Sequence, residues 1–410
     1  MILIFEPIKI FNFFGNAFNN STSSIKKEGQ KMKFAIMESI VGAGGHEIEH
    51  DRVIIEELKA LGHEVELYVP KGYHCAYDYN VPINYLPGKG VSYVGVSGLR
   101  KTWRSLKREF NRLRWYKGIY QQALLGRFDA IIFPTATYRF FRSLNHSPLR
   151  QSPVPLIFCV LGVTPPEGPK FFREVEKLVD FKNIKIVVMS LFDHVLGRKL
   201  PNVFCVKPAV YAPEGLSFKS QVRKANKLKI GFFGQYRKEK RMEDFLEAFT
   251  KCKFERDLEL VVQTVAIKPE DRTALEIIRT KYSDHPHISF FDKAVYGKEW
   301  QEVISEMDAL IIPYAAPRFR FHGSGMLLTA LGQYKPVVIA DEVWHELLNE
   351  YQIGVTYKTG DKEALTKALE TFVNTYDANI EKYLNELKRI SEDLSPSRFV
   401  AEFVRLAGGK

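Results

Sequence analysis

The stretch LKIGFFGQYRKEKRMEDFLEAFTKC, residues 228–252, decides how this chain folds. It opens with a short apolar run that ends in glycine (228–234), continues through a basic loop, and enters the amphipathic segment MEDFLEAFTKC (242–252). A short Ile- and Phe-rich run without strict alternation is typical of a strand buried on both faces of a parallel sheet, and parallel strands are joined through helices. The stretch therefore predicts one strand–loop–helix unit of a parallel α/β sheet.

The same alternation continues on both sides of this unit. Further strands are predicted after it at 258–265, 287–292, 309–314 and 335–341, and before it at 33–39, 62–70, 128–135, 154–162, 184–190 and 202–208. A polar linker at 217–227 separates the two series. Two successive series predict an α/β protein of two Rossmann-like doubly wound domains that face each other across a cleft, at 32–216 and 228–390. We expect a C-terminal helix at 391–410 to return to the first domain.

Length and composition indicate the number of domains and the cellular compartment of the protein. With 410 residues, 45% hydrophobic and 26% charged, the chain has the size of two soluble domains. Its four cysteines are scattered without a C-x-x-C pair, which favours a reducing, cytoplasmic compartment. No apolar run reaches the ~20 residues of a membrane-spanning helix. Because Lys27–Gly29 can be encoded by a ribosome-binding sequence and a strand follows Met32 at once, we expect Met32 to be the natural start and 1–31 a mis-called extension.

Residues 46–50, HEIEH, spell the H-E-x-x-H motif of zinc proteases. In those enzymes both histidines lie inside a helix and a third ligand follows. Here His46 comes directly after the glycine-rich run 42–45 and so stands at a helix start, with no helix placed to offer a third ligand. A glycine loop that opens a helix favours an anion, so we interpret Gly44 and Gly45 as part of a ligand site. A tight turn without a ligand is the alternative, and zinc is the less favoured one.

Three segments of the second half contain recognisable sequence motifs: KIGFFGQYRKEKRMEDFLEAF (229–249), ALIIPY…HGSGMLLTALGQYKPVVIAD (309–341) and NEYQIGVTYKTGDKEALTKALETFV (349–373). In the first half, the stretch GGHEIEHDRVIIEELKALGHEV (44–65) contains a further motif of this kind. These segments resemble the group-1 glycosyltransferases of the GT-B fold, well over about residues 228–375 and elsewhere in pattern. The resemblance implies a second domain that binds a nucleotide-sugar and a first domain that binds an acceptor.

The chain departs from that family at four positions. The family's diphosphate-binding arginine falls at Gln235. Its contact would pass to a nearby cation: Arg237, Lys240 or Arg241. The family's two glutamates, of which the second holds the ribose, fall on Phe321 and Thr329, and the histidine of retaining members falls near Leu161. These departures leave the donor and the stereochemistry open.

Sugar transfer needs stabilisation of the leaving diphosphate, either by a metal on an acidic D-x-D loop or by a helix N-terminus with cationic side chains. We find no such acidic loop at a strand end and expect no metal and no cofactor. The stretch FRFHGSG (319–325) offers the second solution. The predicted donor-binding residues are Gly44, Gly45, Gly234, Arg237, Lys240, Arg241, Arg318, Arg320, His322, Gly323, Ser324 and Gly325. A plain capping turn with solvated arginines is the alternative.

An inverting enzyme also needs a base that takes the proton of the acceptor hydroxyl. We expect Glu47 and His46, at the mouth of the cleft, to be catalytic, with Glu167 in TPPEGP as the reserve. A glutamate at a helix start that only complements the helix dipole is the alternative.

The net charge of +11 is concentrated between Arg100 and Arg150, where twelve basic residues stand against only Glu109 and Asp129. Apolar residues recur there at spacings of three and four and predict an amphipathic helix at 99–125. The stripe consists of Leu99, Trp103, Leu106, Phe110, Leu113, Tyr116 and Tyr120. Such a helix suits an anionic membrane surface, and a stripe that belongs to the core is the equal alternative. The predicted membrane or acceptor face is Trp103, Arg104, Lys107, Arg108 and Arg112.

We therefore interpret the chain as a metal-independent glycosyltransferase of the hexosyltransferase type. It would move a sugar from a nucleotide-sugar to a glycan or lipid-linked acceptor in cell-surface polysaccharide synthesis, at the cytoplasmic face of the membrane. A nucleotide-sugar 2-epimerase of the same fold and a catalytically degenerate nucleotide-binding subunit are the alternatives. Charge alone suggests nucleic acid, but the basic residues form no recognisable nucleic-acid module.

Overall fold

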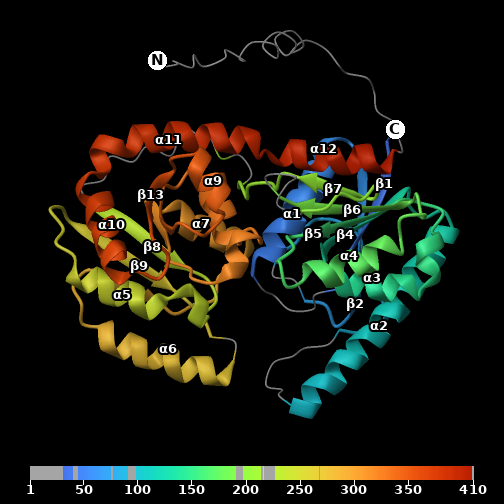
Figure 1. Cartoon of the computed structure of the whole chain (residues 1–410), viewed down its shortest axis with the longest axis horizontal. Helices are drawn as coiled ribbons and strands as arrows, with labels where there is room; N and C mark the ends of the chain where they lie inside the picture. Colours follow the sequence, from blue (N-terminus) through green and yellow to red (C-terminus); the bar gives the residue numbers. More distant parts are fainter. Residues whose placement is uncertain are drawn as a thin grey trace, which may run out of the picture. The chain divides into compact units, whose positions relative to one another are not determined.

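Short buried strands alternate with helices in the computed structural model (Figure 1). It describes residues 31–39, 45–74, 77–90, 98–190, 197–213, 216, 227–266 and 268–408. Residues Met32–Lys410 form one compact unit, which holds every helix and strand described below. Two predicted stretches, the extension at 1–31 and the linker at 217–227, lie almost wholly outside the described residues. Only Lys31 of the first and Lys227 of the second are described.

The first half of this unit is built on a parallel sheet with the strand order β3-β2-β1-β4-β5-β6-β7. Its strands are β1 (Lys33–Met37), β2 (Glu64–Lys71), β3 (Ile83–Lys89), β4 (Ala130–Ala136), β5 (Leu156–Val160), β6 (Ile184–Met189) and β7 (Val203–Val206). All five residues of β5 are buried, as expected for a central strand covered on both faces. The strand order reverses between β1 and β4, and ligands bind at such a point, beyond the carboxyl ends of the strands.

Helices cover both faces of this sheet. They are α1 (Gly45–Ala60), α2 (Gly98–Leu124), α3 (Tyr138–Asn145) and α4 (Gly168–Glu176), with α12 (Pro396–Ala407) from the end of the chain. Side chains alternate along β1: Ala35 and Met37 belong to the core under α2, α3 and α4, whereas Phe34 and Ile36 belong to the core shared with α1 and α12. The C-terminal helix thus lies on the first half, in contact with α1 and β5.

The second half is built on a parallel sheet with the order β10-β9-β8-β11-β12-β13. Its strands are β8 (Leu228–Phe233), β9 (Leu258–Gln263), β10 (Ile288–Phe291), β11 (Ala309–Ile312), β12 (Val337–Ala340) and β13 (Gly354–Tyr357). Its helices are α5 (Met242–Lys251), α6 (Pro269–Tyr282), α7 (Gly297–Ser305), α8 (Gly325–Gly332), α9 (His345–Glu350), α10 (Lys362–Asn374) and α11 (Tyr376–Asp393). The predicted α/β class with two Rossmann-like parallel sheets is confirmed. Strand β3 was not predicted, because it contains Pro87 and lies half-exposed at a sheet edge.

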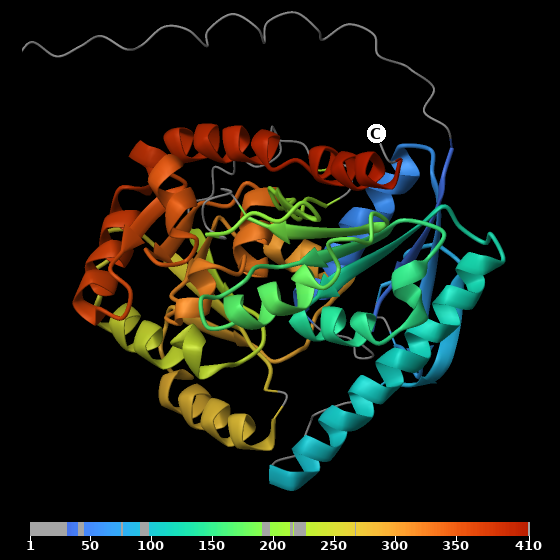
Figure 2. The same cartoon turned by 45° about the vertical axis from the view of Figure 1, so that its right-hand side comes forward.

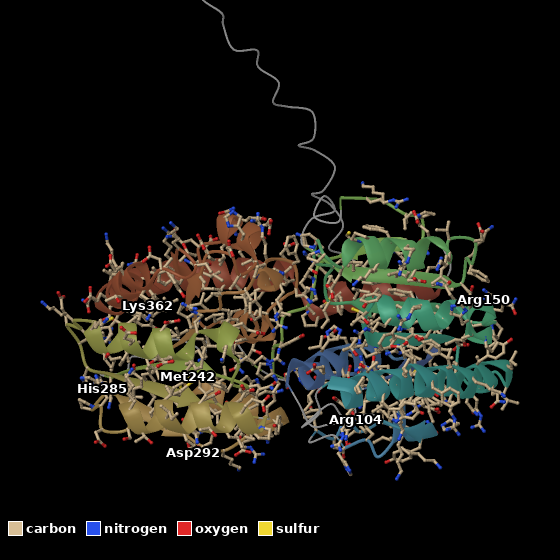
Figure 3. The ribbon with its side chains drawn as sticks, turned by 60° about the horizontal axis from the view of Figure 1, so that its bottom comes forward. Arg104, Arg150, Met242, His285, Asp292 and Lys362 are labelled. Atoms are coloured by element: carbon tan, nitrogen blue, oxygen red, sulfur yellow. The ribbon has the colours of Figure 1, made fainter. Side chains whose placement is uncertain are left out.

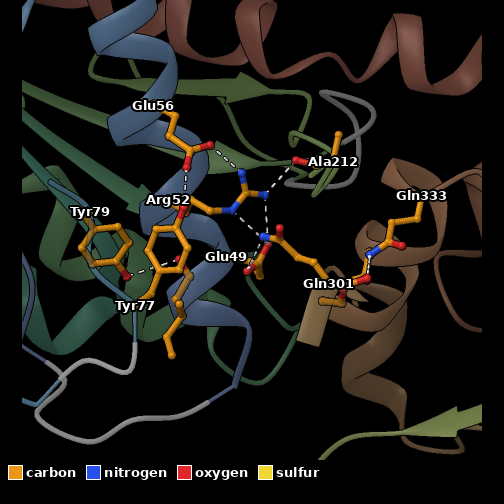
Figure 4. Close-up of polar contacts among 11 residues, drawn as sticks. Glu49, Arg52, Glu56, Tyr77, Tyr79, Ala212, Gln301 and Gln333 are labelled. Carbon is orange, nitrogen blue, oxygen red and sulfur yellow. Dashed lines mark hydrogen bonds and ion pairs between the residues drawn. The ribbon is translucent and has the colours of Figure 1, made fainter. Parts of the chain in front are cut away.

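A buried polar network joins α1 to the second half (Figure 4). Arg52 donates to Glu49 through Nε and Nη2 (3.1 and 2.9 Å), to Glu56 (2.6 Å) and to the carbonyl oxygen of Ala212 (2.8 Å). Gln301 of α7 donates its Nε2 to both oxygens of Glu49, each at 3.2 Å. The side chain of Arg52 is only 2% exposed, so a charge is held in the core by these partners.

Candidate functional site

The loop after β8 brings a lysine to the end of the strand. Gly234 has φ +104°, a conformation that residues with a Cβ rarely adopt, and a Cβ there would lie 2.7 Å from Lys240 Nζ. Glycine is therefore what lets this ammonium come so close. Lys240 Nζ donates to the carbonyl oxygen of Phe233 (3.4 Å) and lies 5.3 Å from the centre of the Tyr314 ring.

Two arginines share this corner with Lys240. Glu239 links them, at 2.5 Å from Nη2 of Arg318 and 3.8 Å from Nη1 of Arg237. Burial, together with repulsion from Arg237 and Arg318, lowers the pKa of Lys240 to about 7. Three basic groups thus converge with a single linking carboxylate, an arrangement that an additional anion would stabilise.

The first turn of α8 faces the same corner. Ser324 is the N-cap residue, is 3% exposed, and accepts a hydrogen bond on Oγ from the backbone N–H of Leu327 (3.3 Å). Gly323 and Gly325 flank it. The N–H groups that open a helix lack an intrahelical acceptor, and together with the helix dipole they favour an anion.

These groups line one pocket, the main pocket, with a volume of about 240 Å³. Of the predicted donor-binding residues, the structure brings these to its wall: Gly234, Arg237, Lys240, Arg318, His322, Gly323, Ser324 and Gly325. Ile48 and Glu49 of α1 and Leu161 after β5 line it from the first half. Both sheets therefore contribute to one site.

Two other predicted donor residues, Arg241 and Arg320, are not on this wall. Arg241 pairs with Asp244 (2.5 Å), and Arg320 lies 3.6 Å from Glu346. Gly44 lies outside the described residues, and of Gly45 the structure describes only that it begins α1.

A second pocket, the side pocket, adjoins the first. Glu47 of α1, Glu167 before α4 and His322 line it, and Leu161 and His322 line both pockets. The Nε2 atom of His322 lies 3.4 Å from Oε2 of Glu167. Two of the three predicted candidates for the base thus share one pocket; the side chain of the third, His46, is not described.

The second histidine of HEIEH lies in the core. His50 places Nε2 3.1 Å from the carbonyl oxygen of Pro134 and 3.7 Å from Sγ of Cys159, and its ring packs near Phe399. Across the part of the chain that the structure describes, no group of three or more His, Cys, Asp and Glu residues could hold a metal ion.

The positions where the chain departs from the family also fall near the site. Gln235 lines the main pocket and accepts a hydrogen bond from Nη2 of Arg237 (3.1 Å). Thr329 lines it too, and its hydroxyl donates to the carbonyl oxygen of Gly325 (2.9 Å). Gln235 therefore carries no charge where the family has its diphosphate-binding arginine, and Thr329 supplies no carboxylate where the family has its ribose-binding glutamate.

Helix α2 has two different halves. Its N-terminal half extends away from the strands (Figure 2), and Leu99, Trp103, Leu106 and Phe110 are exposed on it, Trp103 by 69%. Figure 3 shows Arg104 and Arg150 at the outer surface of the first half, apart from Met242 and Lys362 on the second. No described helix is long and apolar enough to cross a membrane.

One face of the C-terminal half of α2 belongs to the core, and this corrects one predicted residue. Arg112 is 1% exposed, donates from Nη1 to Glu109 (2.8 Å) and Ser143 (3.2 Å), and stacks 4.5 Å from the Phe140 ring centre. It cannot contribute to a membrane or acceptor face, because this turn of α2 packs on α3. Tyr116 of the predicted stripe is likewise buried.

Several residues of the main pocket were not predicted. Among them are Glu49, Gln263, Val295, Tyr296, Trp300 and Tyr314. Tyr314 ends the predicted strand at 309–314, and Gln263 lies near the end of the one at 258–265. The rule that ligands bind at the carboxyl ends of parallel strands could therefore have found both. Glu49 carried no such signal.

No protein-family model and no curated protein matches the sequence. Solved structures do match over nearly the whole chain. A glycosyltransferase from Rickettsia africae gives a TM-score of 0.63 at 13% identity, covering 92% of this chain and 98% of that one. HepE from Anabaena, in complex with UDP and glucose, gives a TM-score of 0.63 at 13% identity. The match covers 92% of this chain and 100% of HepE. Sucrose-phosphate synthase from Thermosynechococcus elongatus gives a TM-score of 0.62 at 13% identity. The match covers 91% of this chain and 98% of the synthase chain. At this identity the likeness establishes the fold, which is GT-B.

Proposed function

We propose that this chain transfers a sugar from a nucleotide-sugar donor to an acceptor hydroxyl and needs no metal to do so. The observation that carries the proposal is the convergence of Arg237, Lys240 and Arg318 on the first turn of α8 at the wall of the main pocket. Negative charge develops on a diphosphate as its bond to the sugar breaks, and fixed cations with a helix N-terminus stabilise that charge. The complex of HepE with UDP and glucose supports this class of donor.

In this proposal the main pocket binds the donor and the side pocket admits the acceptor. The diphosphate would lie against the three cations and the α8 turn, and the nucleoside would extend toward Gln263, Val295 and Tyr296. The sugar would then lie where His322 and Leu161 separate the main pocket from the side pocket, and the acceptor would enter through the side pocket.

A thermal-shift screen tests the donor site. One of UDP, GDP, ADP, dTDP, CDP and CMP should raise the Tm by a few degrees at about 100 times its Kd, where binding adds about 2.7 kcal/mol to the free energy of unfolding. EDTA should leave the shift unchanged. The variant Arg318→Ala should lose most of it, and Arg279→Ala on α6, which does not line the main pocket, should keep it.

Other outcomes of this screen, and of activity assays with nucleotide-sugars, decide against the proposal. A shift that EDTA abolishes would make the site metal-dependent. Conversion of UDP-N-acetylglucosamine without an acceptor would identify an epimerase, and nucleotide binding without turnover in any acceptor extract would identify a degenerate binding subunit. No shift with any nucleotide would overturn the donor site itself.

We further propose that the N-terminal half of α2 rests on an anionic membrane surface, where a lipid-linked acceptor is found, at the cytoplasmic face. Trp103, Leu106 and Phe110 are exposed on one side of a helix that also exposes Lys107 and Arg114. Apolar side chains bordered by cations bind the boundary between headgroups and acyl chains of anionic bilayers.

Co-sedimentation with vesicles tests the membrane contact. The protein should bind vesicles with ~30% phosphatidylglycerol, release at high salt, and bind pure phosphatidylcholine about 10-fold more weakly, because each cation near an anionic surface contributes about 1 kcal/mol. The double variant Trp103→Ala/Phe110→Ala should bind about 10-fold more weakly, whereas Ile277→Ala, an equally exposed residue of α6, should not. Equal binding by the double variant would contradict the proposal.

A further inference from the structure

The main pocket and the side pocket meet at one ionisable side chain. Of the described residues that line these pockets, His322 and Leu161 line both, and only His322 can exchange a proton there. A sugar bound in the main pocket and a hydroxyl bound in the side pocket would both contact this imidazole. Imidazole is also the side chain whose ordinary pKa lies closest to neutral pH, as a proton acceptor in catalysis requires.

The backbone on both sides fixes the place of this histidine. Gly162 follows β5 with φ +150°, and a Cβ there would lie 2.0 Å from the carbonyl oxygen of Phe321 and 3.0 Å from Cα of His322. The loop of the first half and the 321–322 backbone of the second half are therefore in direct contact. A glycine is required at the point of contact, and the contact brings His322 to the wall that holds Glu167.

Glu167 is itself held in position. Its Oε2 accepts hydrogen bonds from the hydroxyl (2.8 Å) and the backbone N–H (3.4 Å) of Thr164, and it stands at the N-terminus of α4. Partial burial acts to raise the pKa of Glu167, but the bonds from Thr164 and the attraction of His322 outweigh burial and lower it. Glu167 thus stays a carboxylate next to the imidazole, and a carboxylate so placed orients an imidazole and stabilises its protonated form.

We propose that His322 is the base that takes the proton of the acceptor hydroxyl, and that Glu167 is the residue that positions it; this inference rests on the proposed function. The proton passes to the imidazole as the acceptor oxygen bonds to the anomeric carbon. The bond from that carbon to the diphosphate breaks, and its electron pair leaves on the diphosphate, next to Lys240 and Arg318. The imidazolium, next to Glu167, returns its proton to water. Attack opposite the leaving group inverts the anomeric configuration.

The competing base is Glu47, which lines the same pocket. Only His322 also lines the main pocket, where the anomeric carbon would be. The two assignments differ in what each variant should do, so they can be separated by experiment.

The test uses the full chain and the variants His322→Gln, Glu167→Gln and Glu47→Gln, with His285→Gln and Glu276→Gln as controls outside these pockets. Turnover is nucleoside diphosphate release from UDP-glucose, UDP-galactose, UDP-N-acetylglucosamine or GDP-mannose, with a lipid extract of host cells as acceptor. We expect kcat to fall at least ~100-fold in His322→Gln and ~10-fold in Glu167→Gln, because a general base contributes about 100- to 10,000-fold. The thermal shift with the matching nucleoside diphosphate should persist in both.

The pH profile of kcat/KM distinguishes a positioning role of Glu167 from a purely structural one. The anomeric configuration of the product tests the inverting mechanism. Removing the carboxylate of Glu167 disfavours the imidazolium, so the acid limb of kcat/KM should move to lower pH in Glu167→Gln. The other described ionisable groups that line these pockets with His322 do not change in this variant. They are Glu47 and Tyr138 in the side pocket and Glu49, Arg237, Lys240, Tyr296, Tyr314 and Arg318 in the main pocket. The product should carry the inverted anomeric configuration by NMR.

Three results would overturn the inference while leaving the proposed function intact: loss of the nucleotide shift in His322→Gln, a fall in kcat with Glu47→Gln but not Glu167→Gln, or a product of retained configuration. A wild type that binds none of the six nucleotides and releases none from the four donors would overturn the proposed function, and this inference with it.

Discussion

Replacing Lys240 with methionine should weaken nucleoside diphosphate binding about 10- to 100-fold, because a hydrogen bond to a charged partner contributes about 1.5–3 kcal/mol. Methionine keeps the length of the side chain and removes the ammonium that lies beside Arg237 and Arg318. The same change should stabilise the protein without nucleotide, since an ammonium whose pKa is lowered to about 7 by burial and like charges is held at a cost.

The sign of the pH dependence comes from this shift. The pKa of Lys240 is about 7 in the folded chain against 10.5 ordinarily, so between these values the unfolded chain binds more protons. The free energy of unfolding therefore rises with pH across this window, and Lys240→Met should lose that contribution. A bound diphosphate favours the ammonium, so nucleotide affinity should fall as pH rises above about 7.

Isothermal titration of the nucleotide from the screen, at pH 6 to 9, measures both effects. Lys238→Met is the matched control, since Lys238 is exposed on the same turn and does not line the main pocket. Equal affinity in Lys240→Met and wild type, or an affinity that does not change with pH, would show that Lys240 does not contact the diphosphate.

The sequence predicts those parts of the site that lie within one strand–loop–helix unit. Gly234 and Lys240 belong to the loop of one such unit, and Lys240 was predicted there from the family resemblance. Ser324 opens the helix of another unit and was predicted from the glycine-flanked turn. The structure brings all three to the wall of the main pocket. Most of the strands were found from their local pattern, because buried parallel strands have a distinctive composition.

What the sequence misses depends on contacts between segments that are far apart in the chain. Glu49 enters the main pocket only because α1 meets α7 at Gln301. Arg112 was predicted to be exposed because local periodicity shows that a helix has an apolar stripe but not where the core ends along it. His322 was predicted as a donor-binding residue, and its pairing with Glu167 depends on the contact at Gly162.

Replacing Arg52 with methionine should lower the free energy of unfolding by about 3–5 kcal/mol, the typical effect of breaking a buried ion pair from one side. The variant leaves Glu49, 4% exposed, with Gln301 as its remaining partner in the network of Figure 4, and leaves the carbonyl oxygen of Ala212 without the guanidinium. Urea unfolding followed by circular dichroism measures the change. The exposed pair of Lys251 with Glu247 is the control, and Lys251→Met should cost less than about 1 kcal/mol.

The double variant Arg52→Met/Glu49→Met shows whether the loss comes from the stranded carboxylate. Two apolar side chains of similar volume often replace a buried ion pair without loss, so the double variant should recover most of the stability that Arg52→Met alone loses. Nucleotide affinity should not recover with it, because Glu49 lines the main pocket and its bond to Gln301 joins the two sheets that form the pocket. If both stability and affinity return, the network serves packing alone; if stability returns and affinity stays low, it aligns the two halves for binding.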